Sequence, residues 1–273
     1  MQVINCDTQI RGFLGPYSAE YRCLYDARLG VPFMPTAIVS AYTPEGFVIG
    51  ADGLRREAKT NEITTRKAIK LHFTETSNGC IGYAWAGTTS ILADGASFNF
   101  IQESESVAKD LAATTFEYFP DYTIRFTDLI YQHFNRANLE DKFAGNLALI
   151  AEGKVVCRIV FVGYFLGAPW RARFEVTKKG KVLTGIHLID VREKPIDFDI
   201  FSGSELMKDK FQPRLDFAPA TLKQATDLVR DYIQRCIDNP YHDKECEEIG
   251  GRIHIAAITP RGFHWIQEPL TDP

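Results

Sequence analysis

The segment TAIVSAYTPEGFVIGADGLRR (36–56) decides the fold, together with TTRKAIKLHF (64–73) and CIGYAWAGTTS (80–90). Two apolar, β-rich runs flank the turn TPEG, a pattern that predicts a β-hairpin. KAIKLHF (67–73) and CIGYAWAG (80–87) predict two further strands, joined at a Ser-Asn-Gly turn. Order therefore begins at Thr36. Residues 1–35 are rich in Gly, Tyr and Arg and show no sustained period, which favours an N-terminal extension.

The rest of the chain predicts helices, then strands, then a helix and a last hairpin. Helical spacing covers 88–118 and 123–138, and strand patterns follow at 146–152, 155–165, 170–176, 182–190 and 198–203. A helix is expected over 221–238, and a hairpin at 252–266 turns at Pro260-Arg261-Gly262. Two blocks of strands, each followed by helices, favour an α+β fold with two antiparallel sheets face to face between helical layers.

Composition excludes several classes of function. The 273 residues carry a formal net charge of −4, so no basic field is available for nucleic acid. No run approaches the roughly 20 apolar residues of a membrane span, no cofactor motif is found, and the N-terminal sequence leads us to expect no signal peptide. The six cysteines form no CxxC pair. They are interpreted as reduced thiols of a cytoplasmic protein.

Four motifs of residues 36–90 give the sequence a family likeness. A Thr opens the first strand, Ala-Asp-Gly ends the second, a Lys starts the third, and Ala-Gly follows the fourth. In this order and spacing they resemble the proteasome β-subunit family of N-terminal-nucleophile (Ntn) hydrolases, as a bacterial-type relative. The resemblance covers about 36–268 and implies the four-layer αββα sandwich of Ntn hydrolases over 36–273, with 1–35 as an extension or propeptide.

The resemblance also implies a set of catalytic residues: Thr36, Asp52, Lys67, Gly87 and Ser202. Thr36 is expected to be the nucleophile, activated by its own α-amine once it becomes N-terminal. Lys67, held by Asp52, would lower the pKa of that amine. The Gly87 N–H would stabilise the oxyanion. Ser202 would be the auxiliary serine, although a plain helix cap is the alternative.

Two smaller motifs leave alternatives open. An acidic residue precedes Gly-Gly in the family, and here Asp243, Glu245 or Glu247 fits. His242 and Cys246 stand four residues apart and could ligate a metal, but no second pair has ligand spacing. We therefore expect neither a metal nor a cofactor.

The leading hypothesis is a proteasome-like threonine hydrolase that cleaves peptide bonds of peptides or unfolded proteins in a self-compartmentalised homo-oligomeric ring. The family likeness also suggests an ATPase as a partner. A catalytically silent structural subunit and an Ntn amidohydrolase acting on a small amide remain alternatives. Active members carry Gly before the nucleophile, whereas this chain has Pro35. Surplus aromatic residues over 88–138, among them Phe98, Phe100 and Tyr118, predict a subunit interface.

Overall fold

The structure is a computed structural model that describes residues 36–56, 62–93, 95–148, 150, 155–193, 197–211 and 218–269. All described residues belong to one unit, Val31–Pro273. The predicted extension over 1–35 lies outside them, so the domain boundary at Thr36 stays a prediction.

The first five-stranded sheet contains the hairpin that the sequence predicted at TPEG. Its order is β12-β1-β2-β13-β14, with β1 Ile38–Thr43, β2 Gly46–Ala51, β12 Phe198–Ser202, β13 His254–Thr259 and β14 Gly262–Gln267. Thr43 pairs with Gly46, and the Thr43 hydroxyl accepts the Gly46 N–H at 3.2 Å, which closes the turn. The C-terminal hairpin is confirmed by the pairing of Thr259 with Gly262.

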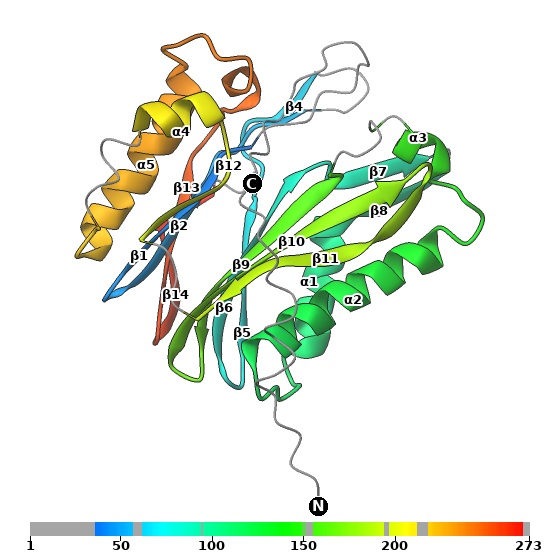
Figure 1. Ribbon diagram of the computed structural model, residues 1–273, viewed down its shortest axis with the longest axis horizontal. Helices are drawn as coiled ribbons and strands as arrows, with labels where there is room; N and C mark the ends of the chain where they lie inside the picture. The colour runs from blue at the N-terminus through cyan, green and yellow to red at the C-terminus, as the bar shows by residue number, and fades with distance from the viewer. Residues whose placement is uncertain are drawn as a thin grey trace, which may run out of the picture. The chain divides into compact units, whose positions relative to one another are not determined.

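The second five-stranded sheet faces the first (Figure 1). Its order is β11-β10-β9-β6-β5, with β5 Leu71–Thr76, β6 Gly79–Gly87, β9 Cys157–Phe165, β10 Ala168–Lys179 and β11 Val182–Arg192. An apolar cluster that includes Ile38, Ile49, Ala84, Val162 and Ile258 fills the space between the sheets. Burial of this surface is the main force that holds the two sheets together.

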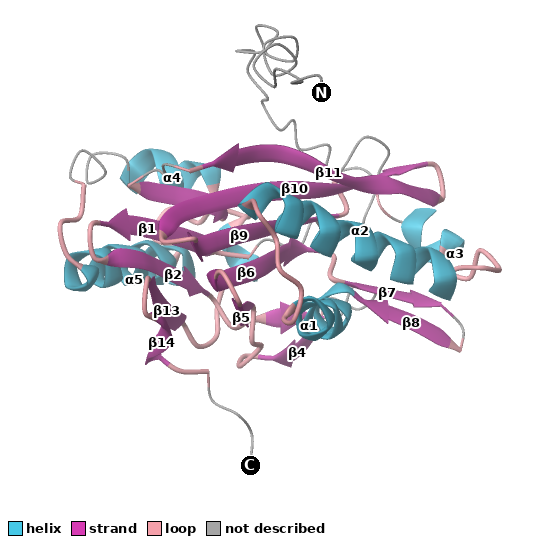
Figure 2. Ribbon diagram, turned by 90° about the horizontal axis from the view of Figure 1, so that it is seen from below, coloured by secondary structure: helices cyan, strands magenta, loops and turns pink. Residues whose placement is uncertain are grey.

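Helices cover the outer face of each sheet. Helix α5 Leu222–Asp238 packs on β1 and β2, whereas α1 Phe100–Leu111 and α2 Phe119–Ala137 lie against the second sheet, as Figure 2 shows from another side. Thr221 caps α5 by accepting the Gln224 N–H at 3.3 Å, as its sequence predicted. The shorter helices are α3 Ala144–Ala148, α4 Glu205–Phe211 and the 3-10 turn Cys246–Glu248. No helix of the described ranges is long and apolar enough to cross a membrane.

The expected fold class, an α+β αββα sandwich of two antiparallel sheets, is corrected by the structure. The fold is mixed α/β with four antiparallel sheets, because two short ribbons stand beside the five-stranded sheets. One ribbon pairs β3 Arg55–Arg56 with β4 Ile63–Thr65, and the other pairs β7 Ser90–Ala93 with β8 Ala96–Asn99. The second ribbon occupies 90–99, where a helix was expected. Ile91 and Phe98 are opposite each other in it and are buried with the helices.

Two further expectations from the sequence are wrong. Residues 144–148 form α3, where a strand was expected from 146. The aromatic residues assigned to a subunit interface mostly belong to the core of this domain: Phe98, Phe100 and Phe119 are buried, and Phe98 packs edge-on against Phe100 and Phe134 at 5.1 Å. Tyr118, 62 % exposed, is the clear exception.

Candidate active site

Asp52 follows β2 and is fully buried at the centre of a hydrogen-bond network. Its carboxylate accepts the backbone N–H of Ala37 at 3.0 Å, of Leu54 at 3.1 Å and of Gly250 at 3.1 Å. It also accepts a hydrogen bond from Lys70 Nζ at 2.9 Å. The three backbone donors come from three different segments of the chain. The carboxylate therefore fixes the start of β1, the loop after β2 and the approach to β13 relative to one another.

Lys70 joins Asp52 to the hydroxyl of Thr36. Its Nζ lies 3.1 Å from Thr36 Oγ1, and all three residues are buried, with exposed fractions of 7 % for Thr36, 0 % for Asp52 and 6 % for Lys70. Burial lowers the pKa of Lys70, the Asp52 carboxylate opposes this shift, and the charge of Arg55 adds to it. An amine with a lowered pKa releases its proton more easily, so Lys70 can exchange a proton with the Thr36 hydroxyl.

The structure brings Thr36 and Asp52 together as predicted, but it places Lys70, not Lys67, beside them. Lys67 lies on the exposed stretch before β5, where its backbone N–H donates to the Thr65 hydroxyl at 3.0 Å. The prediction counted residues from Thr36 along a strand that was expected to start at 67. The strand begins at Leu71 instead, so the lysine that directly precedes it takes this position. The role assigned to Lys67 is corrected accordingly.

His254 was missed by the sequence analysis. It is the first residue of β13, pairs with Ala51, and is fully buried. Its Nε2 lies 2.6 Å from the carbonyl oxygen of Ala68, two residues before Lys70. Burial lowers the pKa of His254, which keeps the ring neutral and able to donate to this carbonyl. The only signal for this residue in the sequence was a histidine at the start of an apolar strand. Its hydrogen-bond partner, Ala68, is 186 residues away in the chain.

Gly87 ends β6 at a position that only glycine fits. Its φ is +93°, and an added Cβ would lie 2.9 Å from the Val156 carbonyl oxygen. Ala86 and Ile38, neighbours of Gly87 and Thr36 in the chain, line a cavity of about 10 Å³ between the sheets. That volume has room for about one water molecule. The function of the Gly87 N–H as an oxyanion donor stays a prediction.

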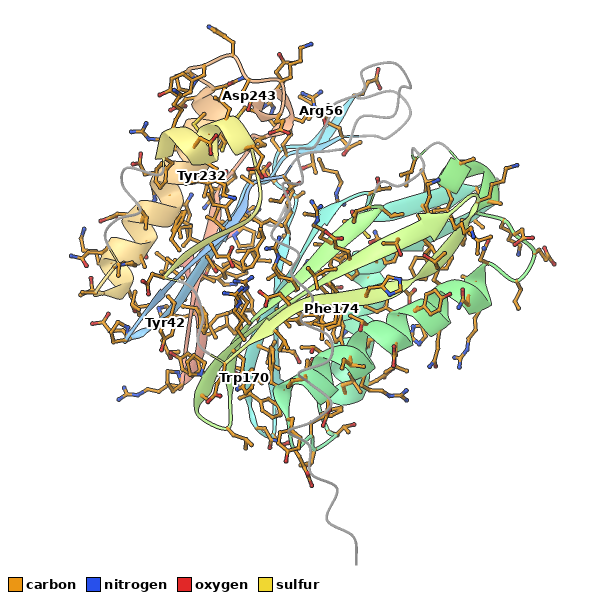
Figure 3. The ribbon with its side chains drawn as sticks, viewed as in Figure 1. Tyr42, Arg56, Trp170, Phe174, Tyr232 and Asp243 are labelled. Carbon is orange, nitrogen blue, oxygen red and sulfur yellow. The ribbon has the colours of Figure 1, made fainter. Side chains whose placement is uncertain are left out.

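Ser202 ends β12 opposite Ile38 and is buried, so it lies on the strand next to the start of β1. Ser204, two residues further, caps α4 by accepting the Met207 N–H at 2.9 Å. The Ser204 hydroxyl donates to the Asp243 carboxylate. Figure 3 shows Asp243 on the side of the molecule formed by α4 and α5.

The structure distinguishes the three acidic candidates. Asp243 contacts the Ser-Gly-Ser segment through Ser204, whereas the Glu245 carboxylate accepts the backbone N–H of Glu205 at 2.9 Å. Glu247 is exposed. Asp243 is thus the candidate that is bonded to this segment through a serine hydroxyl, and its function as the auxiliary acidic residue stays a prediction. In the described part of the chain no group of three or more His, Cys, Asp or Glu is arranged to hold a metal.

Solved structures of Anbu proteins share this fold. A helical assembly of the Anbu complex from Pseudomonas aeruginosa aligns with a TM-score of 0.55 and 15 % identity, covering 86 % of this chain and 88 % of that chain. Anbu (ancestral beta-subunit) from Yersinia bercovieri aligns with a TM-score of 0.54 and 13 % identity, covering 85 % of this chain and 87 % of that chain. An Anbu mutant from Hyphomicrobium sp. strain MC1 aligns with a TM-score of 0.52 and 14 % sequence identity, and the alignment covers 84 % of each chain.

These likenesses show the fold alone, because the identities are low. No family model and no curated protein sequence matches the chain. The placement among bacterial-type Ntn proteasome β-subunits, made from the motifs, is therefore corrected: the solved structures that share this fold include Anbu proteins, and no finding places the chain in the β-subunit family itself.

Proposed function

We propose that this chain is a threonine hydrolase that cleaves peptide bonds with the Thr36 hydroxyl as nucleophile. The observation that carries the proposal is the buried chain of hydrogen bonds from Asp52 through Lys70 to Thr36, with donor–acceptor distances of 2.9 and 3.1 Å. A hydroxyl is a weak nucleophile at neutral pH and needs a base within hydrogen-bond reach. Lys70 Nζ lies at that distance and serves as this base in the removal of 1–35, and Asp52 fixes its direction.

The reaction requires Thr36 to become N-terminal by removal of 1–35. Its α-amine, with an ordinary pKa of roughly 7.7–8.0, then takes the hydroxyl proton as Oγ1 attacks the substrate carbonyl. The neighbouring Lys70 ammonium lowers the pKa of this amine, and the Gly87 N–H faces the developing oxyanion. The tetrahedral intermediate expels the amine half of the substrate, which takes the proton. Water then hydrolyses the ester on Thr36 and restores the hydroxyl.

Removal of 1–35 can use the same groups. The Thr36 hydroxyl attacks the Pro35 carbonyl while Lys70 takes its proton, and the C–N bond breaks to leave an ester that water hydrolyses. The locked φ of Pro35 restricts the approach to the strained conformation that this step needs. Self-cleavage is therefore expected to be slow in the natural sequence.

Intact-mass spectrometry tests the proposal on fresh and aged protein. Wild type is expected to lose 1–35, Pro35→Gly to lose them faster, and Thr36→Ala to stay at full length. Hydrolysis of fluorogenic peptides should appear together with the shortened form. The hydrolase proposal fails if wild type and Pro35→Gly both stay at full length and do not hydrolyse peptides.

A catalytically silent structural subunit is the second candidate. It is favoured by the three backbone N–H groups that Asp52 satisfies, because these give the carboxylate a purely structural function. It is also favoured by Pro35 in place of Gly. The mass experiment separates the two candidates.

We also propose that the chain forms a homo-oligomer. The support is its fold likeness to Anbu proteins, one of which is described as a helical assembly. Light scattering is expected to give a mass well above one 30.8 kDa subunit at micromolar concentration. The ring form, a partner ATPase, unfolded-protein substrates and a cytoplasmic location remain predictions.

A further inference from the structure

Two free cysteines lie next to each other at the end of α5. Cys236 is in the last turn of this helix, and Cys246 opens the 3-10 turn that packs against it. Both belong to one buried apolar cluster, with exposed fractions of 0 % for Cys236 and 2 % for Cys246. A hydrogen bond joins the two thiols. The side chains therefore face each other at short range, which is the arrangement that a disulfide requires.

The loop between the two cysteines is held by its own hydrogen bonds. Asn239 ends α5 in the left-handed conformation, with a φ of 44°. Its side chain donates to the Asp243 carbonyl at 2.9 Å and accepts the Asp243 N–H at 2.7 Å. The Asp243 carbonyl also accepts the Cys246 N–H at 3.0 Å. These bonds keep Cys246 beside the end of the helix that carries Cys236.

The two thiols differ in acidity. The hydrogen bond between them is the main cause that raises the pKa of Cys236 and lowers the pKa of Cys246. Burial and the carboxylates of Asp243 and Glu245 oppose the second shift but do not cancel it. The thiolate is the reactive form of cysteine. Cys246 is therefore the nucleophile of the pair, and Cys236 is the neighbour that keeps its proton.

We propose that Cys236 and Cys246 form a redox-sensitive pair, which a peroxide converts to a disulfide. The Cys246 thiolate attacks a peroxide oxygen, so that an S–O bond forms, the O–O bond breaks and hydroxide leaves. The Cys236 sulfur then attacks the sulfenic acid, so that the S–S bond forms, the S–O bond breaks and water leaves with the Cys236 proton. Two electrons pass from the thiols to the peroxide. A low-molecular-weight thiol restores both cysteines by exchange.

The site is close to the surface and to the candidate active site. The neighbours Lys244 and Glu247 are exposed, so local opening of a short loop is enough to admit a peroxide to Cys246. Four residues after Cys246, the Gly250 N–H donates to Asp52 at 3.1 Å. The disulfide would thus tie to α5 the segment that leads to this donor. The chemistry does not depend on the hydrolase function.

Trypsin separates the two cysteines, which makes the cross-link directly measurable. Cleavage after Arg235, Lys244 and Arg252 gives CIDNPYHDK (236–244) and ECEEIGGR (245–252), each with one cysteine. The full-length protein is treated with a small molar excess of hydrogen peroxide, blocked with N-ethylmaleimide in denaturant, and digested without reductant. We expect the joined peptides, at the sum of their masses less two hydrogens. Dithiothreitol should return the separate thiol peptides.

Variants test the order of the two steps, with circular dichroism to check that each is folded. Cys236→Ala should retain a sulfenic acid at Cys246 that dimedone traps. Cys246→Ala should give neither the joined peptides nor a dimedone adduct at Cys236. Cys80→Ala is the control and should form the disulfide like wild type, because burial raises the pKa of Cys80 to about 12. The joined peptides should exceed oxidised Cys80 by at least about tenfold, since each pKa unit changes the thiolate fraction tenfold.

The other outcomes would overturn the proposal. Oxidation of Cys80 while Cys236 and Cys246 are both blocked as thiols would show that the pair is inert. Cys246 recovered as sulfinic acid beside a blocked Cys236 would show that the second thiol cannot reach it. Joining of either cysteine to a different partner would show that the fold does not direct the pairing. A dimedone adduct at Cys236 in folded Cys246→Ala would contradict the assignment of the nucleophile.

Discussion

Replacement of Lys70 tests the candidate site most directly. Lys70→Met keeps the volume of the side chain and removes the nitrogen that lies 3.1 Å from Thr36 Oγ1. Removal of a positioned electrostatic group or base typically lowers kcat by about 10²–10³-fold. We expect this loss in peptide hydrolysis and an equal slowing of the removal of 1–35. Initial rates with a fluorogenic peptide and intact-mass time courses measure the two effects.

The same substitution should reduce stability by an amount that follows from the geometry. At 2.9 Å and an effective dielectric constant of about 20, the attraction between Lys70 and Asp52 is about 6 kcal/mol before desolvation is subtracted. Breaking a buried pair from one side typically costs about 3–5 kcal/mol. The lowered pKa of Lys70 shows that desolvation offsets the attraction, so urea unfolding of Lys70→Met should show a loss at or below the lower end of this range, although Asp52 loses its counter-ion.

Two controls separate catalysis from folding. The double variant Asp52→Asn with Lys70→Met removes both charges and should recover part of the stability without recovering activity. Lys67→Ala changes an exposed residue and should stay within about 0.5 kcal/mol of wild type with full activity. If Lys67→Ala lost activity while Lys70→Met kept it, the assignment of Lys70 would be refuted.

Two further predictions concern stability. Ser104→Ala leaves the buried Trp85 Nε1 without its acceptor at 2.8 Å and should lower the free energy of unfolding in urea by about 1–3 kcal/mol. The control Ser106→Ala, on the exposed side of α1, should lower it little. Equal losses in the two variants would contradict the importance of this hydrogen bond. Burial lowers the pKa of Lys70 below 10.5, so the unfolded chain binds more protons between the two pKa values. The free energy of unfolding that Lys70 contributes should rise with pH across that window and reach its full value above 10.5. Lys70→Met should remove this slope, and an unchanged slope would contradict the lowered pKa.

Local patterns predicted the strand hairpins well, because their signal lies within a few residues. The turn at TPEG satisfies its own backbone through Thr43, and the C-terminal hairpin does so through Thr259, whose hydroxyl accepts the Arg261 N–H at 3.2 Å. Helix α5 was equally readable, because its cap and apolar stripe are local. Such features need no knowledge of distant parts of the chain.

The ribbon at 90–99 shows where local reading fails. Each strand has only four residues, so its alternation of apolar and polar residues is short. The neighbouring helix α1 gives a longer helical pattern, which dominates a sequence segment that includes both. Phe98 is buried because α1, α2 and the ribbon enclose it together, with Phe100 and Phe134 around its ring. Counting aromatic residues along the chain cannot distinguish such a core from a subunit interface.

The identity of the lysine in the candidate site depended on contacts that the sequence does not display. Lys67 and Lys70 look equivalent in the run TTRKAIKLHF, since both precede apolar residues. The choice is made by His254, which holds the Ala68 carbonyl, and by the Gly53 carbonyl, which accepts the Ala68 N–H at 2.8 Å. These bonds orient 68–70 so that the third residue, not an earlier one, reaches Asp52.

Asp52 and Lys70, the two charged residues of the candidate site, differ in how far the stability of the fold depends on them. Asp52 would be retained in a silent subunit, because its carboxylate satisfies three buried backbone N–H groups that would otherwise lack partners. Among the described residues Lys70 is hydrogen-bonded to two side chains and to no backbone group, and burial of its ammonium is unfavourable enough to lower its pKa. A buried pair of this kind is often replaceable by apolar residues without loss of stability. The pair with Asp52 fits either candidate, whereas the position of Lys70 Nζ 3.1 Å from the Thr36 hydroxyl supports the proposed hydrolase.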